Sequence, residues 1–370
     1  MNLPALTLDR LVARAVRNLG PVNIEPSPRT NIVFGDNGQG KTSLLEAIYL
    51  VATSRSFRTA KLRDVVQHGE RGFRVAATWS ERRGELPSLD REQVVAYEGR
   101  ASQVRIDGNP ASTLASYATK SPVVVFHAEE LALTTGAASI RRRLLDRVAL
   151  YVAPASARAA GAYARALKTR QELLRRGSSD VELEAYEDVA ARAGAELTRG
   201  RARAAAELEL DVSRAFEDIG VSNATLGVRY ERGGSEDADE AKHELWDRRS
   251  RDTRAPSATF GPHRDDLVIT LEGHVARTVA SQGQHRALTL AIKAAESSTI
   301  ARCTGLEPVQ LLDDVSSELD PKRTAALFFH LSKRRAQVFV TTTRPDVVAA
   351  ALGEENTKHF QVVGGIVTVA

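Results

Sequence analysis

The sequence predicts an α/β fold that is interrupted by a long, mostly α-helical insertion. Short apolar runs separated by turn residues fill the first third of the 370 residues. A stretch rich in Ala, Arg, Glu and Leu follows at residues 131–219, and an alternation of strand-like and helical segments returns after it. We therefore expect a discontinuous α/β domain at residues 1–130 and 255–370, with a helical lobe at residues 131–254.

The N-terminal part contains one helical segment among several strand-like ones. Leu44, Leu45, Ile48 and Val51 recur at helical spacing, which indicates a helix over residues 42–52. Apolar or β-branched runs predict strands at residues 31–34, 73–79, 93–97, 103–106 and 123–126. The turn sequence at residues 107–110 separates two of these segments.

The helical insertion has an uneven distribution of charge. Residues 141–176 contain ten Arg or Lys and two acids, whereas residues 180–218 contain eleven acids and five Arg. The sequence Gly177-Ser178-Ser179 lies between them and predicts a tight turn. We expect an arm that folds back on itself with complementary charge on its limbs. Two interpretations of the basic limb stay open, a solvated helix face and a contact with DNA.

The C-terminal part returns to an α/β pattern. A loop is expected at residues 233–240. Strands are expected at residues 268–271, 309–312 and 337–341, and helices at residues 284–299 and 321–334.

The overall composition limits the functional classes that are possible but does not select one of them. A formal net charge of +4 and an isoelectric point near 9.2 permit a nucleic-acid partner but do not require one. The single cysteine, Cys303, excludes an internal disulfide and a Cys-rich zinc site, and we expect it to be buried in a reducing compartment. The sequence shows no signal-peptide pattern and no apolar run of membrane-spanning length, so a soluble, cytoplasmic protein is expected.

Residues 35–42 match the phosphate-binding pattern G-x-x-x-x-G-K-S/T in full, and the match stands between an expected strand and an expected helix. Glycines allow successive backbone N–H groups to turn inward around an anion at the helix N-terminus. Lys41 is expected to contact the β- and γ-phosphates as a catalytic group, and Thr42 to bind Mg²⁺. The expected nucleotide-binding residues are Gly35, Asp36, Asn37, Gly38, Gln39, Gly40, Lys41, Thr42 and Ser43.

A pair of acids follows the expected strand at residues 309–312. In a parallel sheet, Asp313 and Asp314 would lie at the same edge as the phosphate-binding loop. Asp313 is expected to hold Mg²⁺, and Asp314 to orient or deprotonate the attacking water as a catalytic residue. The next residues, 316–320, are similar to the D-loop of ABC-type ATPases. They also suit a helix N-cap, with Asp320 before Pro321, and both interpretations can hold together.

A second anion cradle is expected at the head of the helix at residues 284–299. Its residues, Ser281, Gln282, Gly283 and Gln284, are similar to the signature motif of ABC-type ATPases. One subunit has no use for two γ-phosphate cradles that lie far apart. In ABC-type ATPases the second cradle completes the site of the partner subunit. This motif therefore predicts a P-loop NTPase of the ABC-ATPase or SMC-head type that sandwiches ATP between two subunits.

The chain resembles the RecF family over nearly its whole length. The stretch Gly-Pro-His-Arg-Asp-Asp-Leu at residues 261–267 is the most specific match, although a turn followed by a strand would also explain it. Further matches lie at residues 35–42 together with 45–48, and at residues 54–59. Gly136 together with residues 141–146 also matches, as do residues 281–284 and the pair of segments 312–314 and 317–320.

The chain departs from the family pattern at a few positions. Ala128 stands where the family usually has Pro, and Val16 replaces an aromatic residue. Thr341 and its neighbours stand where many ABC ATPases have a switch histidine. Asp314 replaces the usual ABC glutamate, as it does in RecF proteins. We expect these last two differences to make hydrolysis slow.

The resemblance implies a DNA clamp that is controlled by ATP and Mg²⁺. It would form an ATP-dependent homodimer, bind double-stranded or gapped DNA, and act with RecR and RecO to load RecA. The DNA candidates are Arg141, Arg142, Arg143 and Arg264, whereas Arg58 could contact either the nucleotide or DNA.

Two other classes compete with the clamp. The first is an ABC-type ATPase that drives a transporter or another non-DNA assembly, and the second is a coiled-coil protein of the chromosome-condensing type. A transporter subunit would need a surface that couples to membrane helices, and usually a switch histidine. A condensing protein would need a far longer arm than the one expected here.

Overall fold

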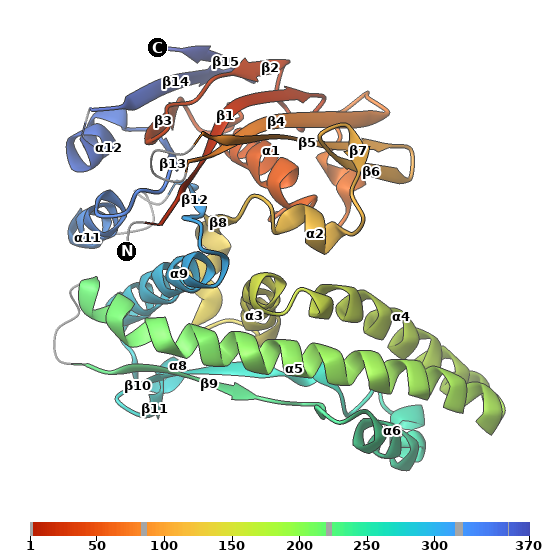
Figure 1. Ribbon diagram of the computed structural model, residues 1–370. Helices are drawn as coiled ribbons and strands as arrows, with labels where there is room; N and C mark the ends of the chain where they lie inside the picture. The colour runs from red at the N-terminus through yellow and green to blue at the C-terminus, as the bar shows by residue number, and fades with distance from the viewer. Residues whose placement is uncertain (1–2, 83–86, 220–223, 315–320, 354) are drawn as a thin grey trace. The chain divides into compact units, whose positions relative to one another are not determined.

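The computed structural model describes residues 3–82, 87–219, 224–314, 321–353 and 355–370, and it divides into two compact units (Figure 1). The first, which we call the sheet unit, contains Met1–Leu131, Glu217–Val221 and Glu296–Ala370. The second, the helical unit, contains Ala132–Phe216 and Ser222–Ala295. This boundary at Ala295 differs from the one expected at residue 254, because the strands at 226–231 and 266–271 pair within the helical unit.

An antiparallel sheet forms one layer of the sheet unit. Its strands are ordered β2-β1-β4-β5-β6-β7. Their bounds are β1 Ala5–Arg14, β2 Val22–Ile24, β4 Gly72–Arg82, β5 Leu89–Glu98, β6 Ala101–Ile106 and β7 Asn109–Pro110. Buried and less buried residues alternate along much of β1 and β4, which is the pattern of a sheet with one face on the core.

A second, largely parallel sheet has the order β15-β14-β3-β13-β12-β8. Its bounds are β3 Thr30–Phe34, β8 Val123–Phe126, β12 Val309–Leu312, β13 Val338–Thr342, β14 Thr357–Val363 and β15 Ile366–Val369. All residues of β8, β12 and β13 are buried, because both faces of a parallel sheet are covered. Its parallel strands bring the ends of β3, β12 and β13 to one edge.

Helix α1 (Lys41–Thr53) packs between the two sheets. Twelve of its thirteen residues are buried, and its apolar side chains share one core cluster with residues of both sheets. Figure 1 shows α11 and α12 beside the second sheet. The other helical elements of this unit are α2 Leu114–Ala118, α11 Pro321–Ser332, α12 Pro345–Leu352 and the short 3₁₀ helix Leu62–Val65.

The helical unit is built on three helices and a small antiparallel sheet of order β11-β10-β9. The helices are α3 Ala138–Val152, α4 Ala155–Arg176 and α5 Asp180–Asp218, and the strands are β9 Leu226–Glu231, β10 Asp266–Leu271 and β11 His274–Val275. Shorter helices are α6 Ala238–Asp247, α7 Arg249–Arg254, α8 Ala276–Val279 and the 3₁₀ helix Pro262–Arg264. The 3₁₀ helix Ala128–Leu133 and helix α9 Gln282–Thr304 each have residues in both units.

Charge complementarity along the arm takes the form of a buried ion-pair network. Arg170 on α4 is fully buried, and its Nε donates to Glu187 Oε1 on α5 at 3.0 Å. Its Nη1 donates to Asp252 Oδ2 at 2.7 Å. The turn at Gly177 between α4 and α5 uses a left-handed backbone with φ of 67°, as the glycine there allows. The expected fold-back is therefore present, and a buried network helps to hold it.

The structure bears on two further expectations, the burial of Cys303 and the absence of membrane-spanning segments. Cys303 is exposed, so the prediction that it is buried is wrong; it lies near the C-terminal end of α9, where the helix ends at Thr304. Within the described residues, no helix combines the length and apolarity needed to cross a bilayer.

Candidate nucleotide-binding site

The phosphate-binding loop lies between β3 and α1, in the context that the sequence predicts. Gly40 is the N-cap of α1 and has a φ of 117°, a conformation that residues with a Cβ rarely adopt. Gly35 has a φ of 151°, and a Cβ there would lie 2.3 Å from the carbonyl oxygen of Val362. Both glycines are therefore required by the path of the backbone, which leads the loop into the N-terminus of a buried helix.

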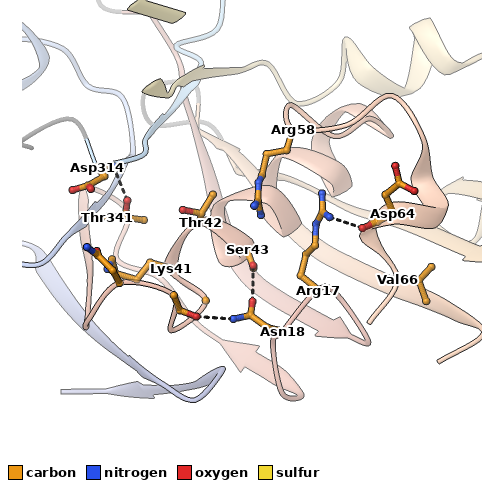
Figure 2. A pocket seen from close by; sticks show the side chains of 13 residues that line it. Arg17, Asn18, Lys41, Thr42, Ser43, Arg58, Asp64, Val66, Asp314 and Thr341 are labelled. Carbon is orange, nitrogen blue, oxygen red and sulfur yellow. Dashed lines mark hydrogen bonds between the residues drawn. The ribbon is translucent and has the colours of Figure 1, made fainter. Parts of the chain in front are cut away.

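The loop opens on a cavity of about 580 Å³ (Figure 2). Residues of the loop and of α1 line it together with Asp314 and Thr341 from the ends of the parallel strands. Arg17, Asn18 and Arg58 line it as well, and of these three the sequence indicates only Arg58. The cavity belongs entirely to the sheet unit, and the cationic side chains of Arg17, Lys41 and Arg58 all line it.

Lys41 points into this cavity from the first turn of α1. It is 7% exposed, and its Nζ donates to the carbonyl oxygens of Gly35 at 2.7 Å and Asp36 at 2.9 Å. These contacts hold the ammonium group over the loop, where a bound phosphate would lie within its reach. A triphosphate fits this set of donors, because loop amides and a lysine are complementary to its charge.

Thr42 and Asp313, the two residues expected to bind Mg²⁺, lie in hydrogen-bond contact. The Thr42 hydroxyl donates to Asp313 Oδ1 at 2.8 Å, although 271 residues separate the two in sequence. A hydroxyl and a carboxylate at this distance are suitable ligands for Mg²⁺. Burial raises the pKa of Asp313, the neighbouring Asp314 carboxylate adds to the rise, and the hydroxyl groups of Thr42 and Thr341 oppose it.

Thr341 connects the two acids of the site, and sequence reasoning did not identify this role. Its hydroxyl donates to Asp313 Oδ1 at 2.8 Å and accepts from the backbone N–H of Asp314 at 2.8 Å. Asp314 has a φ of 49°, in the left-handed region. A strained backbone of this kind persists only where its surroundings fix it. Thr341 therefore fixes the backbone that carries Asp314.

Glu46 on α1 binds two arginines at the rim of the cavity. It is fully buried, and it accepts from Arg17 Nε and Nη2 at 2.9 Å each and from Arg58 Nη1 at 3.2 Å. The Ser56 hydroxyl donates to it at 2.5 Å. Hydrogen bonding to Glu46 is the main reason that the pKa of Arg17 is raised. This arrangement places Arg58 on the nucleotide side, which favours one of the two roles left open for it.

Asn18 ties the loop to the antiparallel sheet. Its Nδ2 donates to the carbonyl oxygen of Gly38 at 3.0 Å, and its Oδ1 accepts from the Ser43 hydroxyl at 2.8 Å. Both contacts are visible in Figure 2. The residue lies shortly after the end of β1, and a single polar residue in that position has no sequence pattern that marks it as part of a nucleotide site.

The signature residues form a capping box at the head of α9. The backbone N–H of Ser281 donates to Gln284 Oε1 at 2.8 Å, and the backbone N–H of Gln284 donates to the Ser281 hydroxyl at 3.3 Å. Gln282 and Ser281 are exposed, and Gly283 is half-buried. The motif therefore presents the N-terminus of a long helix, as the sequence predicts. The expected D-loop at residues 316–320 lies outside the described residues.

The stretch at residues 261–267 holds the helical unit together. Asp265 is fully buried and accepts from Arg201 Nη1 at 2.9 Å, from the Tyr230 hydroxyl at 2.7 Å and from the backbone N–H of Gly233 at 2.8 Å. His263 Nδ1 shares a hydrogen bond of 2.6 Å with the Tyr163 hydroxyl. Burial is the main cause of the lowered pKa of His263. The local role of this motif is therefore structural.

Two of the DNA candidates, Arg141 and Arg142, make contacts with the same stretch. Arg141 is 8% exposed, and its Nε and Nη2 donate to the two carboxylate oxygens of Asp266 at 2.7 and 2.8 Å. Its guanidinium group is thus bound inside the unit, and its contact with DNA stays a prediction. Arg142 is half-buried and donates to the carbonyl oxygen of Asp265 at 2.8 Å. Arg143 and Arg264 are exposed and stay candidates.

We expect Asp313→Asn to stabilise the protein while it weakens metal-dependent nucleotide binding. The raised pKa means that ionised Asp313 destabilises the fold, and this cost is present above the folded pKa and absent at low pH. Asparagine removes the cost, so the thermal unfolding midpoint without nucleotide should rise near neutral pH and converge with that of the wild type towards acid pH. Affinity for the Mg²⁺–nucleotide should fall by about tenfold or more.

Scanning fluorimetry across a pH series measures the first effect, and titration with a fluorescent nucleotide in the presence and absence of Mg²⁺ measures the second. An equal affinity of wild type and Asp313→Asn for the nucleotide in Mg²⁺ would contradict the assignment of this carboxylate.

The chain matches a known protein family over nearly its whole length. Residues 7–368 match the family model described as the RecF/RecN/SMC N terminal domain. The DNA replication and repair protein RecF of Anaeromyxobacter sp. (strain Fw109-5) is 39% identical over 372 residues, which cover 98% of this chain and 99% of that protein.

Two solved structures extend the comparison to the fold. The recombination mediator protein RecF-ATP in the RecFOR pathway matches with a TM-score of 0.84 and 27% identity, and covers 99% of this chain and 100% of that one. An Smc head bound to the C-winged helix domain of ScpA matches at 15% identity with a TM-score of 0.55 over 98% and 96% of the two chains, and shares the fold alone. The chain has the mixed α/β fold of SMC-type ATPase heads with a long helical insertion, and it belongs to the RecF family.

Proposed function

We propose that this protein is an ATP-controlled DNA clamp of recombinational repair that acts at replication gaps in the cytoplasm. The proposal rests on one observation. Lys41, Thr42 and Asp314 line the same cavity, and Thr42 also contacts Asp313. A similar RecF protein has been solved as RecF-ATP, which supports ATP as the ligand here. By family membership, DNA, RecR, RecO and RecA are the proposed partners, and RecA loading is the proposed outcome.

ATP would bind with its phosphates on the loop amides at residues 35–40 and on Lys41. Mg²⁺ would be held by Thr42 and Asp313, and would neutralise charge on the phosphates when bound. Glu46 would keep the guanidinium groups of Arg17 and Arg58 aimed at the same cavity. Asp314 would orient the attacking water, and its short side chain and the lack of a histidine at residues 341–343 would keep hydrolysis slow.

The signature residues would complete the site of a second subunit. The N-terminus of α9 offers backbone N–H groups and a helix dipole to an anion, and the described contacts of Ser281 within its own chain are those of a cap. ATP would then join two subunits, and hydrolysis would separate them. A homodimer that closes only with ATP bound is the simplest switch that such a geometry supports.

We expect Ser281→Arg to leave ATP binding by the monomer unchanged and to block ATP-dependent dimerisation. The long side chain would fill the space that a partner's γ-phosphate needs. Nucleotide titration at low protein concentration and light scattering with ATP measure the two effects. Ser281→Ala serves as the milder comparison, since it removes only the hydroxyl. A loss of monomer ATP binding in Ser281→Arg would show that Ser281 acts within its own subunit.

Binding of a DNA duplex with and without ATP, across a salt series, tests the clamp itself. Binding that is tighter with ATP and that weakens steeply with salt is expected, because phosphate contacts release counterions. Binding that does not depend on ATP would remove the clamp model. An absence of duplex binding under all conditions would favour the alternative of an ABC-type ATPase that drives a non-DNA assembly or a transporter.

A further inference from the structure

The antiparallel sheet of the sheet unit has an outer face that carries arginine. Residues at alternate positions of β1 and β4 point inward to the core cluster that includes α1, among them Leu11, Ala13 and Val75. The positions between them form the opposite face of the sheet. Arg10, Arg14 and Arg74 lie on this outer face, and all three are exposed.

These arginines line a groove of about 370 Å³. Its floor is made by small side chains such as Val12, Ala76 and Thr78, and Glu92 is the acid at its border. Arg105 on β6 continues the basic face, because it pairs with Val94, which in turn lies opposite Ala76. Small residues flanked by long cationic ones make a shallow channel that can accommodate an extended anion.

The arrangement of the charges is unfavourable for the isolated protein. Arg14 and Arg74 are direct partners in the register of β1 and β4, and like charges at directly opposed positions destabilise a sheet. Among the described residues, no carboxylate lies within 4.0 Å of the guanidinium nitrogens of Arg10, Arg14 or Arg74. Arg10 Nε donates to Asn23 Oδ1 at 3.0 Å. An anion bound between Arg14 and Arg74 would relieve this repulsion.

We propose that this groove binds the phosphate backbone of double-stranded DNA; the inference rests on the proposed DNA clamp and adds a contact surface to it. The planar guanidinium group of arginine donates two parallel hydrogen bonds to a phosphate. Single-strand binding relies on aromatic side chains on which bases stack. Where the structure describes β1, β2, β4, β5 and β6, their outer-face positions carry no aromatic residue: Trp79 and Phe73 are buried on the inner side. The face is therefore suited to a duplex.

The Arg14→Ala/Arg74→Ala double variant of the full chain tests this inference. The probe is a fluorescein-labelled DNA duplex, with the corresponding single strand as a second probe, and anisotropy is recorded with ATP over a salt series. We expect duplex affinity to fall on the order of tenfold at moderate salt. The slope of log K against log salt should become shallower by about 0.9 for each phosphate that the variant no longer neutralises.

Arg335→Glu is the matched control. It changes the net charge by the same amount as the double variant, and it alters an exposed residue between α11 and β13, away from the outer face. Its duplex affinity should stay within about twofold of the wild type, because Arg335 does not line the groove and salt screens exposed charges. Arg74→Glu is a second test, since it would place a negative charge directly opposite Arg14 on the neighbouring strand. It should fold at least as stably as the wild type and bind the duplex more weakly still.

Three results would overturn the inference while the clamp stands. They are wild-type duplex affinity in the double variant, an equal loss in Arg335→Glu, and a loss that is as large for the single strand as for the duplex. If the wild-type protein itself shows no ATP-dependent duplex binding, the proposed function fails first and the groove loses its ligand with it. ATP-dependent dimerisation of each variant confirms that the nucleotide site is intact.

Discussion

Lys41→Ala is expected to abolish ATP binding and ATP-dependent dimerisation together. The ammonium group enters the cavity from the loop helix itself, and the residue is 7% exposed. Hydrogen bonds to charged groups contribute about 1.5–3 kcal/mol each, and the lysine would make more than one to the phosphates. The expected loss is therefore about 3 kcal/mol or more, which is roughly 100-fold or more in affinity.

The measurement is a titration with a fluorescent ATP analogue, followed by light scattering with ATP. Lys61→Ala is the matched control, because Lys61 is exposed and does not line the cavity. Without nucleotide the fold should tolerate the change, since Lys41 contacts only carbonyl oxygens of its own loop in the described hydrogen bonds. An ATP-dependent dimer of Lys41→Ala would contradict the assignment of the site.

Arg170→Ala is expected to destabilise the helical unit by about 3 kcal/mol, because it leaves buried carboxylates without their central cation. Glu187 and Asp252 are fully buried beside it. Both keep other donors: Arg249 also contacts Glu187, and the Thr259 backbone and hydroxyl contact Asp252. These remaining contacts place the cost at the lower end of the range measured for broken buried ion pairs.

Denaturant unfolding monitored by circular dichroism measures this loss. Arg192→Ala is the control on the same arm, because its ion pair with Asp188 is an exposed i, i+4 pair and should contribute only about 0.3–0.5 kcal/mol. Equal midpoints for the two variants would show that the buried network does not stabilise the arm.

The parts of the fold that could be predicted are those with a local signal. Strands β3, β8, β12 and β13 are short, mostly apolar or β-branched runs. The loop before α1 has the spacing of glycines and lysine that is typical of a phosphate-binding loop. The helical arm follows from composition over a long stretch. In each case, neighbouring residues carry enough information to indicate the element.

The parts that could not be predicted depend on partners far away in sequence. Thr341 and Glu46 are single polar residues, and their roles appear only when distant strands and α1 come together. Arg141 belongs to a basic run that suggests DNA, but its partner Asp266 lies 125 residues later. The end of the helical unit differs from the expected one because the pairing of β9 with β10, and not composition, decides which residues belong to it.

The place of β3 in its sheet has a consequence for synthesis on the ribosome. β3 emerges early, yet both of its neighbours, β13 and β14, come from the last tenth of the chain. Until β13 and β14 have been synthesised, this apolar strand has no hydrogen-bonding partner in its native sheet, whereas residues 132–216 and 222–295 of the helical unit are already available to fold. The nascent chain therefore exposes an unpaired, aggregation-prone strand while the residues between β3 and β13 are synthesised. Dependence on a ribosome-associated chaperone is the expected consequence of building a nucleotide site from segments that lie far apart in one polypeptide.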